Sequence, residues 1–471
     1  MIDRIEVRNP RTGKIDYWIT SPTRTELIDT CARLRQAQVD WHRDGLERRI
    51  EAVQQWKQAI VSHKAELVEA LAVDTGRLSE SMLEVKSLVS SIDRWCSLAP
   101  ELLQSESKTT AVPFVRLEQQ LVPYPLVGVI SPWNFPLLLS AIDTIPALLA
   151  GCAVIIKPSE VTPRFIQPWL KTIALVPQLR DILTCVSGAG DTGAALVELV
   201  DLVCFTGSVA TGRKVALAAA RQFIPAFLEL GGKDPAIVLA SADIELATSA
   251  ILWGATANAG QSCLSIERIY VEESIGNRFV ELLVTKAKKL KFNYPSLDSG
   301  EIGPIIAREQ ADIISEHLQE AIERGGIVCC GGGIEQLDGG LWCQPTVLTQ
   351  VNHDLKVMSE ETFAPIMPVM FFSRPEKSIS LANDSKYGLS AAVFAGSSEE
   401  ALKIANCLQA GAVSINDAGL TAFIHEAEKN SFKFSGMGGS RMGAAALTRF
   451  MRKKALIIKT NSLDDPWWYK T

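Results

Sequence analysis

Histidine and closely paired cysteines are what this 471-residue sequence has least of. Its five histidines are scattered, and none of its ten cysteines belongs to a CxxC pair. Structural zinc sites need closely spaced cysteine and histidine ligands, and disulfide frameworks are typical of small secreted proteins. We therefore expect no metal site and no disulfides, and we predict a cytoplasmic protein with reduced thiols.

Long apolar segments and an excess of positive charge are also missing. The longest apolar stretch, residues 136–156, is broken by Asp143, Pro146 and Gly151, whereas a membrane helix needs about 20 largely apolar residues. The polar amino terminus lacks the apolar core of a signal peptide. The net charge is −6, with both signs mixed along the chain. Neither membrane insertion nor nucleic-acid binding is expected, because the chain has no basic stripe.

The sequence is rich enough in apolar residues, at 47%, to form large buried cores, and its length predicts two or three domains. Helical spacing of apolar and charged residues runs through residues 25–105. After Leu121, short β-branched runs alternate with helical stretches, and a second such series begins near Cys263. This alternation is typical of βαβ units. We predict an α/β protein with two domains in tandem that meet near Gly231.

One cysteine has unusual neighbours. In "NAGQSCLS", Cys263 follows Gly260, Gln261 and Ser262, where a core strand would have valine or leucine. A nucleophilic thiol needs a polar niche of this kind for a developing oxyanion. The alternative is an inert buried cysteine, because free cysteine is among the most buried residue types.

A carboxylate lies 34 residues earlier, in "FLELGGKDP". Glu229 stands between Leu228 and Leu230 at the end of an apolar run, and glutamate is almost never buried without a partner. Desolvation makes such a carboxylate a stronger base, and Gly231 and Gly232 leave it room to move. Helix capping or an ion pair is the structural alternative.

Three further segments follow predicted strands. Asn134 of "SPWNFP" can donate its side-chain amide to an oxyanion, although Asn and Pro are also common in ordinary turns. In "IIKPSE", Lys157 and Glu160 offer a donor and an acceptor to ribose hydroxyls. "FTGSVATG" is a strand, a Gly-Ser turn and a helix start whose N–H groups can bind a pyrophosphate.

In combination, these segments resemble the aldehyde dehydrogenase superfamily. The matching motifs occur in family order over residues 132–416: "PWNFP", "KPSE", "FTGS....G", "LELGGK", "GQSC", "EETFAP", "NDSKYGLSAAVF" and "GAVSIN". The resemblance implies two Rossmann-like α/β domains and a small β oligomerisation flap, with a homodimer or homotetramer as the assembly. It places the NAD-binding domain at 1–105 and 125–231, the catalytic domain at 232–437, and the flap and tail at 106–124 and 438–471.

The resemblance also implies the residue roles of a hydrolytic, NAD(P)-dependent aldehyde dehydrogenase. Cys263 is the nucleophile that forms a thiohemiacetal and then a thioester, Asn134 and the Cys263 N–H hold the oxygen, and Glu229 activates the hydrolytic water. The implied cofactor contacts are Ile130, Ser131, Pro132, Trp133, Lys157, Ser159, Glu160, Gly190, Phe205, Thr206, Gly207, Ser208, Gly212, Leu230, Gly231, Glu361 and Phe363. The implied substrate tunnel contains Leu139, Ile142, Ser262, Leu264, Phe423 and His425.

NAD is favoured as cofactor, because Glu160 would accept from the 2′-hydroxyl and repel a 2′-phosphate, while Lys157 keeps NADP possible. Succinate-semialdehyde enzymes resemble this chain but typically carry an arginine where it has Ile142, so we expect an apolar aliphatic, aromatic or terpenoid aldehyde. The alternatives are succinate semialdehyde as substrate, a coenzyme A-acylating enzyme, and a non-catalytic binding protein on the same fold.

The sequence departs from the family near its end. In "EKNSFKFSGMGGSRMG", Glu428 to Gly443, the usual Gly pair is absent and a residue is inserted, so that the usual glutamate falls at Ser440 or Arg441. Asp143 stands where many relatives have a lysine. In the family, that lysine and that glutamate form a polar chain behind the general base. We hypothesise a charge-swapped pair of Asp143 with Arg441; two unrelated surface charges are the alternative.

Overall fold

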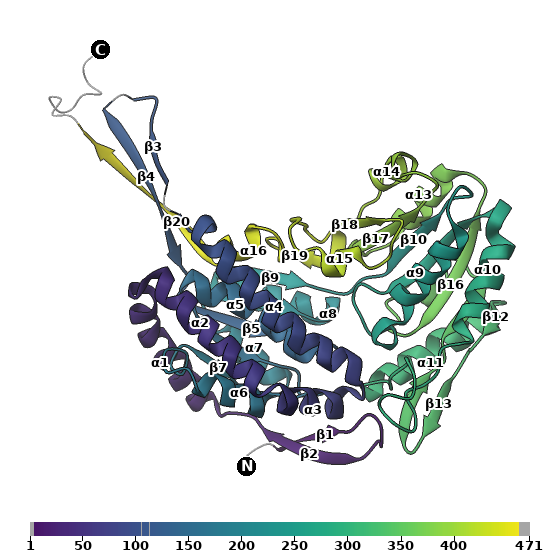
Figure 1. The fold of residues 1–471 in the computed structure, drawn as a ribbon, viewed down its shortest axis with the longest axis horizontal. Helices are drawn as coiled ribbons and strands as arrows, with labels where there is room; N and C mark the ends of the chain where they lie inside the picture. Colours follow the sequence, from purple (N-terminus) through teal and green to yellow (C-terminus); the bar gives the residue numbers. More distant parts are fainter. Residues whose placement is uncertain (1–3, 105, 113, 461–471) are drawn as a thin grey trace.

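The computed structural model describes residues 4–104, 106–112 and 114–460. They form two α/β parts side by side and a three-stranded sheet that projects away from the first part (Figure 1). The predicted fold class is therefore confirmed. Among the described residues, no helix combines the length and the apolar character that crossing a bilayer requires.

The first α/β part contains a six-stranded sheet in the order β19-β9-β8-β5-β6-β7, parallel except for β19. Every residue of β5, β6 and β8 is buried, as expected where helices cover both faces of a parallel sheet. Its strands are β5 (Leu126–Ile130), β6 (Ala153–Lys157), β7 (Leu183–Cys185), β8 (Leu202–Thr206), β9 (Ala226–Glu229) and β19 (Gly436–Met437). Its helices are α1 (Arg24–Arg43), α2 (Gly45–Ser62), α3 (Lys64–Thr75), α4 (Leu78–Leu102), α5 (Pro136–Ala150), α6 (Ile166–Ala174), α7 (Gly190–Val197), α8 (Val209–Gln222) and α16 (Ala445–Thr448).

The second α/β part contains a seven-stranded sheet in the order β12-β15-β16-β11-β10-β17-β18. Alternate residues of β10 face two different cores, Ile237 on one side and Ala236 and Val238 on the other. Its strands are β10 (Asp234–Val238), β11 (Ile266–Glu272), β12 (Ile327–Cys330), β15 (Thr346–Thr349), β16 (Ile366–Phe372), β17 (Ser390–Phe394) and β18 (Ala412–Ile415). Its helices are α9 (Ile244–Thr256), η1 (Ala257–Gly260), α10 (Glu273–Ala287), α11 (Arg308–Glu323), α12 (Lys356–Ser359), α13 (Pro375–Asn383), α14 (Ser398–Ala405), α15 (Leu420–Phe423) and η2 (Lys433–Ser435).

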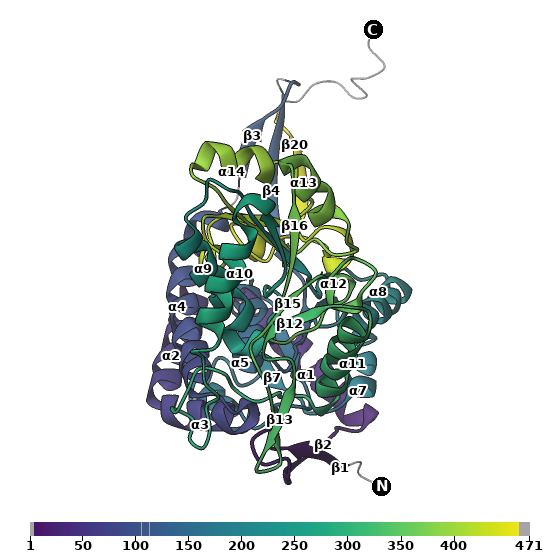
Figure 2. The same ribbon diagram turned by 90° about the vertical axis from the view of Figure 1, so that its right-hand side faces the viewer.

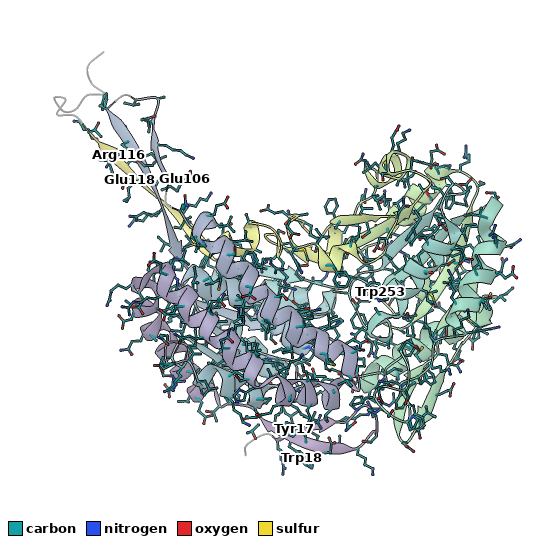
Figure 3. All side chains as sticks on the ribbon, in the orientation of Figure 1. Tyr17, Trp18, Glu106, Arg116, Glu118 and Trp253 are labelled. Atoms are coloured by element: carbon teal, nitrogen blue, oxygen red, sulfur yellow. The ribbon has the colours of Figure 1, made fainter. Side chains whose placement is uncertain are left out.

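The projecting sheet is formed by the antiparallel strands β3 (Glu106–Thr109), β4 (Val115–Pro123) and β20 (Met451–Lys459). Its side chains are largely exposed, and Arg116 pairs with Glu118 at 2.9 Å on its surface (Figure 3). The segments expected for the flap and the tail, 106–124 and 438–471, include these strands, the last of which begins at Met451. The segment before it folds back instead, because Ala446, Leu447 and Phe450 are buried in the core of the first part. The expected tail beyond residue 460 lies outside the described residues.

Two short hairpins complete the fold, β1 (Arg4–Arg8) with β2 (Ile15–Thr20), and β13 (Ile334–Leu337) with β14 (Gly340–Cys343). Both lie at the end of the molecule opposite the flap (Figure 2). Arg11, in the turn of the first hairpin, donates to the Asn293 carbonyl at 2.8 Å, so this segment contacts the second part although we expected it in the first domain. Arg164 packs over Tyr17 from the first part.

Candidate active site

A cavity of about 140 Å³ lies between the carboxyl ends of the strands of the first sheet and the segments that lead into β10, β11 and β16 of the second sheet. Its wall contains Cys263, Glu229 and Asn134, the three predicted catalytic residues. The sequence separates these residues widely, and the two sheets bring them together. Ligands bind in this position, beyond the carboxyl ends of strands, in open α/β sheets.

Cys263 lies on a tight loop between η1 and β11. Asn258 and Ala259 have positive φ angles of 58° and 53°, which turn the chain sharply just before it. Gly232 permits the close approach of this loop, because a Cβ there would overlap the carbonyl oxygen of Cys263. Burial, and after it the charges of the carboxylates of Glu361 and Asp234, raise the pKa of the thiol to about 12, although Lys429 opposes them. The thiol is therefore protonated at neutral pH.

This raised pKa predicts how Cys263 reacts with iodoacetamide. Because only the thiolate reacts, the alkylation rate should rise roughly tenfold per pH unit from pH 7 to pH 9, without levelling off. Peptide mass spectrometry would measure the rate at Cys263 and, as an internal control, at the exposed Cys407 of the same chain. A plateau at Cys263 below pH 8 would show a resting thiolate and contradict this prediction.

Glu229 ends β9 and points into the cavity. One carboxylate oxygen, Oε2, accepts a hydrogen bond from the Ser431 hydroxyl at 3.0 Å. Thr206 of β8 and Gly436 of β19 are its partners in the sheet register. No ion pair to Glu229 within 4.0 Å occurs among the described residues, so the ion-pair alternative is not what holds it.

Asn134 is fixed with its amide facing the cavity. Its Nδ2 donates to the Gln261 carbonyl at 3.0 Å, two residues before the cysteine. Its own backbone carbonyl accepts from Arg77 at 3.1 Å and from Asn258 at 3.2 Å. A carboxamide nitrogen carries two hydrogens, and only one has an acceptor in the described chain. The other is available to an oxygen beside Cys263.

Several supporting residues were not predicted. Gln261 is buried, donates to the Pro304 carbonyl at 3.1 Å and accepts from the Ile306 N–H at 3.0 Å. Gln310 lines the cavity. Gln261 and Asn258 stand inside the motif around Cys263, so their polarity was a usable signal. Arg77 and Gln310 lie far from every motif, and nothing in the sequence marks them.

Nine of the predicted cofactor contacts line the same cavity. Trp133 and Phe363 meet edge to face at 5.4 Å, and Phe363 has a φ of 58°, an unusual backbone state for a large residue. Glu361 accepts from the Gly232 N–H at 3.0 Å, and burial raises its pKa to about 8. The other lining residues of this set are Pro132, Thr206, Gly207, Ser208, Leu230 and Gly231.

The remaining predicted cofactor contacts lie outside that cavity, along the same edge of the first sheet. Lys157 and Glu160 pair at 2.8 Å just after β6, and Glu160 is about one-third exposed. Gly193 of α7 packs near Ile130 and Lys157. The others are Ser131, Ser159, Gly190, Phe205 and Gly212, which end strands or lie at or near the starts of helices.

The predicted substrate tunnel is only partly formed by the expected side chains. Leu139 lines the cavity, whereas Ile142, Ser262, Leu264, Phe423 and His425 do not. Phe423 packs against Trp253 at 5.8 Å and is half exposed. His425 is partly buried; burial lowers its pKa, and the charge of Arg94 lowers it further. These side chains flank the site rather than contact the space beside Cys263.

The hypothesised pair of Asp143 with Arg441 is present in the structure. The Arg441 guanidinium donates to Asp143 Oδ2 at 2.8 Å, and both side chains are buried. A second arginine that was not predicted, Arg449, binds Asp143 Oδ1. The alternative of two unrelated surface charges is therefore wrong.

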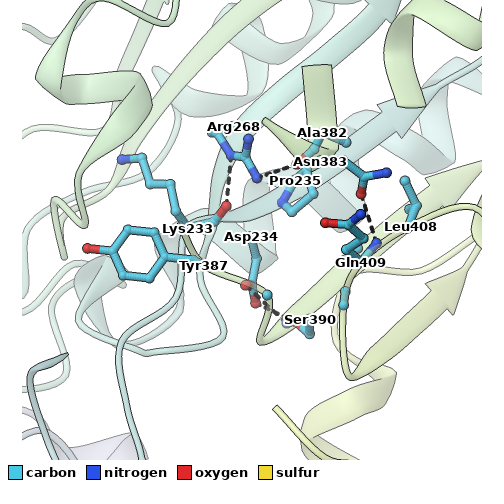
Figure 4. Close-up of a pocket in the computed structure, with 13 residues that line it drawn as sticks. Lys233, Asp234, Pro235, Arg268, Ala382, Asn383, Tyr387, Ser390, Leu408 and Gln409 are labelled. Carbon is cyan, nitrogen blue, oxygen red and sulfur yellow. Dashed lines mark hydrogen bonds between the residues drawn. The ribbon is translucent and has the colours of Figure 1, made fainter. Parts of the chain in front are cut away.

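A second, smaller cavity lies behind the glycine turn of the site (Figure 4). Its volume of about 10 Å³ has room for a single water at most. Arg268 donates to the Lys233 carbonyl at 2.8 Å, and the Ser390 N–H donates to Asp234 at 3.1 Å. Its polar groups fix the chain that carries Gly231 and Gly232. Within the described ranges, no group of histidine, cysteine, aspartate and glutamate side chains is arranged to bind a metal.

Comparison of the sequence with known proteins identifies its family. The model of the aldehyde dehydrogenase family matches residues 2–456. The 4,4'-diapolycopene aldehyde oxidase of a Methylomonas species is 37% identical over 81% of this chain and 72% of its own length. A protein of Mycobacterium ulcerans, provisionally named succinate-semialdehyde dehydrogenase [NADP(+)] 2, is 31% identical over 97% of this chain and 89% of its own.

Solved structures extend the comparison to three dimensions. A chain from Anabaena variabilis, provisionally assigned as the aldehyde dehydrogenase PutA, is 64% identical with a TM-score of 0.98, and the match covers 99% of this chain and 100% of that one. The betaine aldehyde dehydrogenase of Staphylococcus aureus, solved with NAD+, is 30% identical with a TM-score of 0.93 over 99% and 93% of the two chains. The chain belongs to the aldehyde dehydrogenase family.

Proposed function

We propose that this protein oxidises an aldehyde to a carboxylic acid with NAD, through covalent intermediates on Cys263. The observation that carries the proposal is the single cavity lined by Cys263, Glu229 and Asn134. A nucleophile, a base and an oxyanion donor in one enclosed space are the parts that acyl chemistry requires.

The residues act in a definite order. The Cys263 sulfur attacks the aldehyde carbon, and the thiol proton leaves as the bond forms, because the thiol is protonated at rest. Glu229 is the neighbouring carboxylate that receives this proton. The free N–H of Asn134 donates to the new oxyanion of the thiohemiacetal, which is held in place beside Gln261.

The first sheet fits a dinucleotide. The turn at Gly207 and Ser208 leads into α8, whose N-terminus attracts a phosphate, and Lys157 and Glu160 stand where an adenosine ribose would lie. Trp133, Glu361 and Phe363 would position the nicotinamide end beside the thiol. When bound, the cofactor supplies hydride acceptance, which converts the thiohemiacetal to a thioester. Glu160 favours NAD over NADP, and the S. aureus relative was solved with NAD+.

Water completes the reaction. Glu229 first releases the thiol proton to solvent, and as an ionised carboxylate it then takes a proton from a water molecule as that water attacks the thioester carbon. The sulfur leaves as the thiolate of Cys263, which regains a proton from Glu229. The carboxylate is held toward the site by the hydrogen bond that it accepts from Ser431. A coenzyme A-acylating enzyme would not need such a base, and this argues for hydrolysis.

An apolar aldehyde remains the proposed substrate class. Leu139 is the predicted tunnel residue that lines the cavity, and the Methylomonas relative carries the name of an enzyme for a terpenoid aldehyde. The name of the mycobacterial relative supports the alternative, succinate semialdehyde. Ile142 gives less support to an apolar substrate than its position in the sequence does, because its side chain does not line the cavity.

A substrate panel tests this proposal. NADH formation at 340 nm would be followed with succinate semialdehyde, hexanal, benzaldehyde and retinal, each with NAD and with NADP. We expect kcat/KM to be at least tenfold higher for the apolar aldehydes, and higher with NAD, because Glu160 repels a 2′-phosphate. Activity confined to succinate semialdehyde would contradict the proposed apolar substrate class and leave the proposed reaction mechanism unchanged. Rates that depend on added coenzyme A would overturn the hydrolytic mechanism.

Two broader expectations stay predictions. The flap extends from the body with all of β3 exposed, which suits the proposed role in a homodimer or homotetramer. A cytoplasmic location is likewise still proposed on the composition of the sequence alone.

A further inference from the structure

Three charged side chains lie together behind Glu229, and their charges do not sum to zero. Asp143 on α5 is 1% exposed and contacts two guanidinium groups, Arg441 at 2.8 Å and Arg449. Arginine stays protonated at any pH at which the protein is folded. The three side chains, named here the Arg–Asp–Arg triad, therefore have a net charge of +1 in a site largely closed to water.

Thr206 of β8 lies between the triad and Glu229. The Arg441 guanidinium donates to the Thr206 hydroxyl at 2.5 Å. Thr206 is the residue directly opposite Glu229 in the register of β8 and β9. Burial lowers the pKa of Arg441, but the carboxylates of Asp143 and Glu229 outweigh it and raise the pKa above its usual value. Arg441 therefore responds to the charge of Glu229.

Arg449 has a second set of contacts that fixes it beside Asp143. Its guanidinium lies over the rings of Phe227 at 4.9 Å and Phe450 at 5.1 Å. It is only 4% exposed. With Arg449 held there, Asp143 is shared between two cations, and one positive charge is left without a counterion in the triad. Buried net charge is costly unless a partner compensates it.

We propose that the Arg–Asp–Arg triad is a positioning device that keeps Glu229 ionised, because the charges of the triad and of Glu229 sum to zero only when Glu229 is a carboxylate. This rests on the proposed role of Glu229 as the base for hydrolysis. Arg441 and Arg449 act through Glu229 and do not touch the substrate. The net positive charge of the triad favours the carboxylate form of Glu229, which is the form that can take a proton from water.

Glu229 shares the surroundings of the Cys263 thiol with two other charged groups, Glu361 after α12 and Lys429 on the segment before η2, and these groups must be held constant in any test. Cys204 of β8 lies against the triad and stays a neutral thiol, because burial raises its pKa. All of them remain unchanged in the variants below, so their effects cancel between proteins.

The test compares variants by the net charge that they leave in the triad. Arg449→Met removes one positive charge but leaves the pair of Asp143 with Arg441, so the acid limb of the steady-state rate should move about one unit to higher pH. Asp143→Asn adds net positive charge and should move the limb to lower pH. Asp143→Asn with Arg449→Met restores the net charge of +1 and should return the limb to the wild-type position. Circular dichroism and melting temperature would confirm that each variant is folded.

A second readout does not depend on activity. In protein labelled with [δ-13C]glutamate, the resonance missing from Glu229→Gln belongs to Glu229, and its titration midpoint should follow the same three shifts. An unchanged midpoint in Arg449→Met, or shifts of equal sign in Arg449→Met and Asp143→Asn, would overturn the proposal. If the midpoints shift as expected but Glu229→Gln keeps full turnover, the triad is supported and the role proposed for Glu229 in catalysis is wrong.

Discussion

Cys263→Ala is expected to abolish aldehyde-dependent NADH formation, with a fall in kcat of at least about 10³-fold, because the substitution removes the atom that carries both covalent intermediates. The cavity wall loses little more than the sulfur, so cofactor binding should persist. Stopped-flow absorbance at 340 nm would measure both the burst and the steady state with the best aldehyde of the panel.

The matched control for this variant is Cys407→Ala, which changes an exposed thiol on the second α/β part. It should retain the wild-type rate. Substantial turnover in Cys263→Ala would contradict covalent catalysis, and equal inactivation of both variants would point to an effect on folding rather than on chemistry.

Glu229→Gln is expected to separate the two halves of the reaction. The steady-state rate should fall about 10² to 10⁴-fold, because the water that attacks the thioester loses its base. A burst of NADH should remain, slowed at neutral pH and faster at high pH, where the Cys263 thiol ionises without help. Rapid mixing with NADH absorbance, followed by mass spectrometry of the quenched protein, would detect the burst and the accumulated acyl-enzyme.

Glu426→Gln is a suitable control, since Glu426 is an exposed carboxylate five residues before Ser431. It should behave as wild type. Absence of an acyl-enzyme in Glu229→Gln would mean that the carboxylate is needed before hydride transfer. Recovery of turnover on addition of coenzyme A to this variant would show that the thioester can pass to a thiol acceptor.

The sequence predicted the site residues that stand in short motifs of unusual composition. Asn134 follows β5 and Glu229 ends β9, and parallel strands bring such positions to one edge of a sheet. Cys263 stands instead in a short polar motif that leads into β11 of the second sheet. The pair of Asp143 with Arg441 was predictable for a different reason, since both positions depart together from a family pattern. The two α/β parts were predictable from the alternation of short apolar runs with helical stretches.

The sequence could not predict contacts that depend on packing between distant segments. Arg449 binds Asp143 because α16 folds back onto α5, and no motif marks that return. The residue at which the projecting strand begins, Met451, could not be predicted for the same reason, because apolar residues such as Phe450 suit a strand as well as a buried turn. The tunnel positions were inferred from spacing alone, and the orientation of His425 and Phe423 depends on an irregular segment with no periodicity to guide a prediction.

The return of residues 436–450 to the first α/β part also determines when during synthesis the enzyme is complete. Domains near the amino terminus usually fold first on the ribosome. Here the edge of β9 stays unpaired until β19 emerges, after the whole second part has been translated. The nascent chain thus exposes an open strand edge, a recognised site of misassembly, while residues 230–435 are translated. A protease cut in the segment between α15 and η2 would leave the nucleophile intact yet release Ser431, Arg441 and Arg449 from the fragment that carries the base.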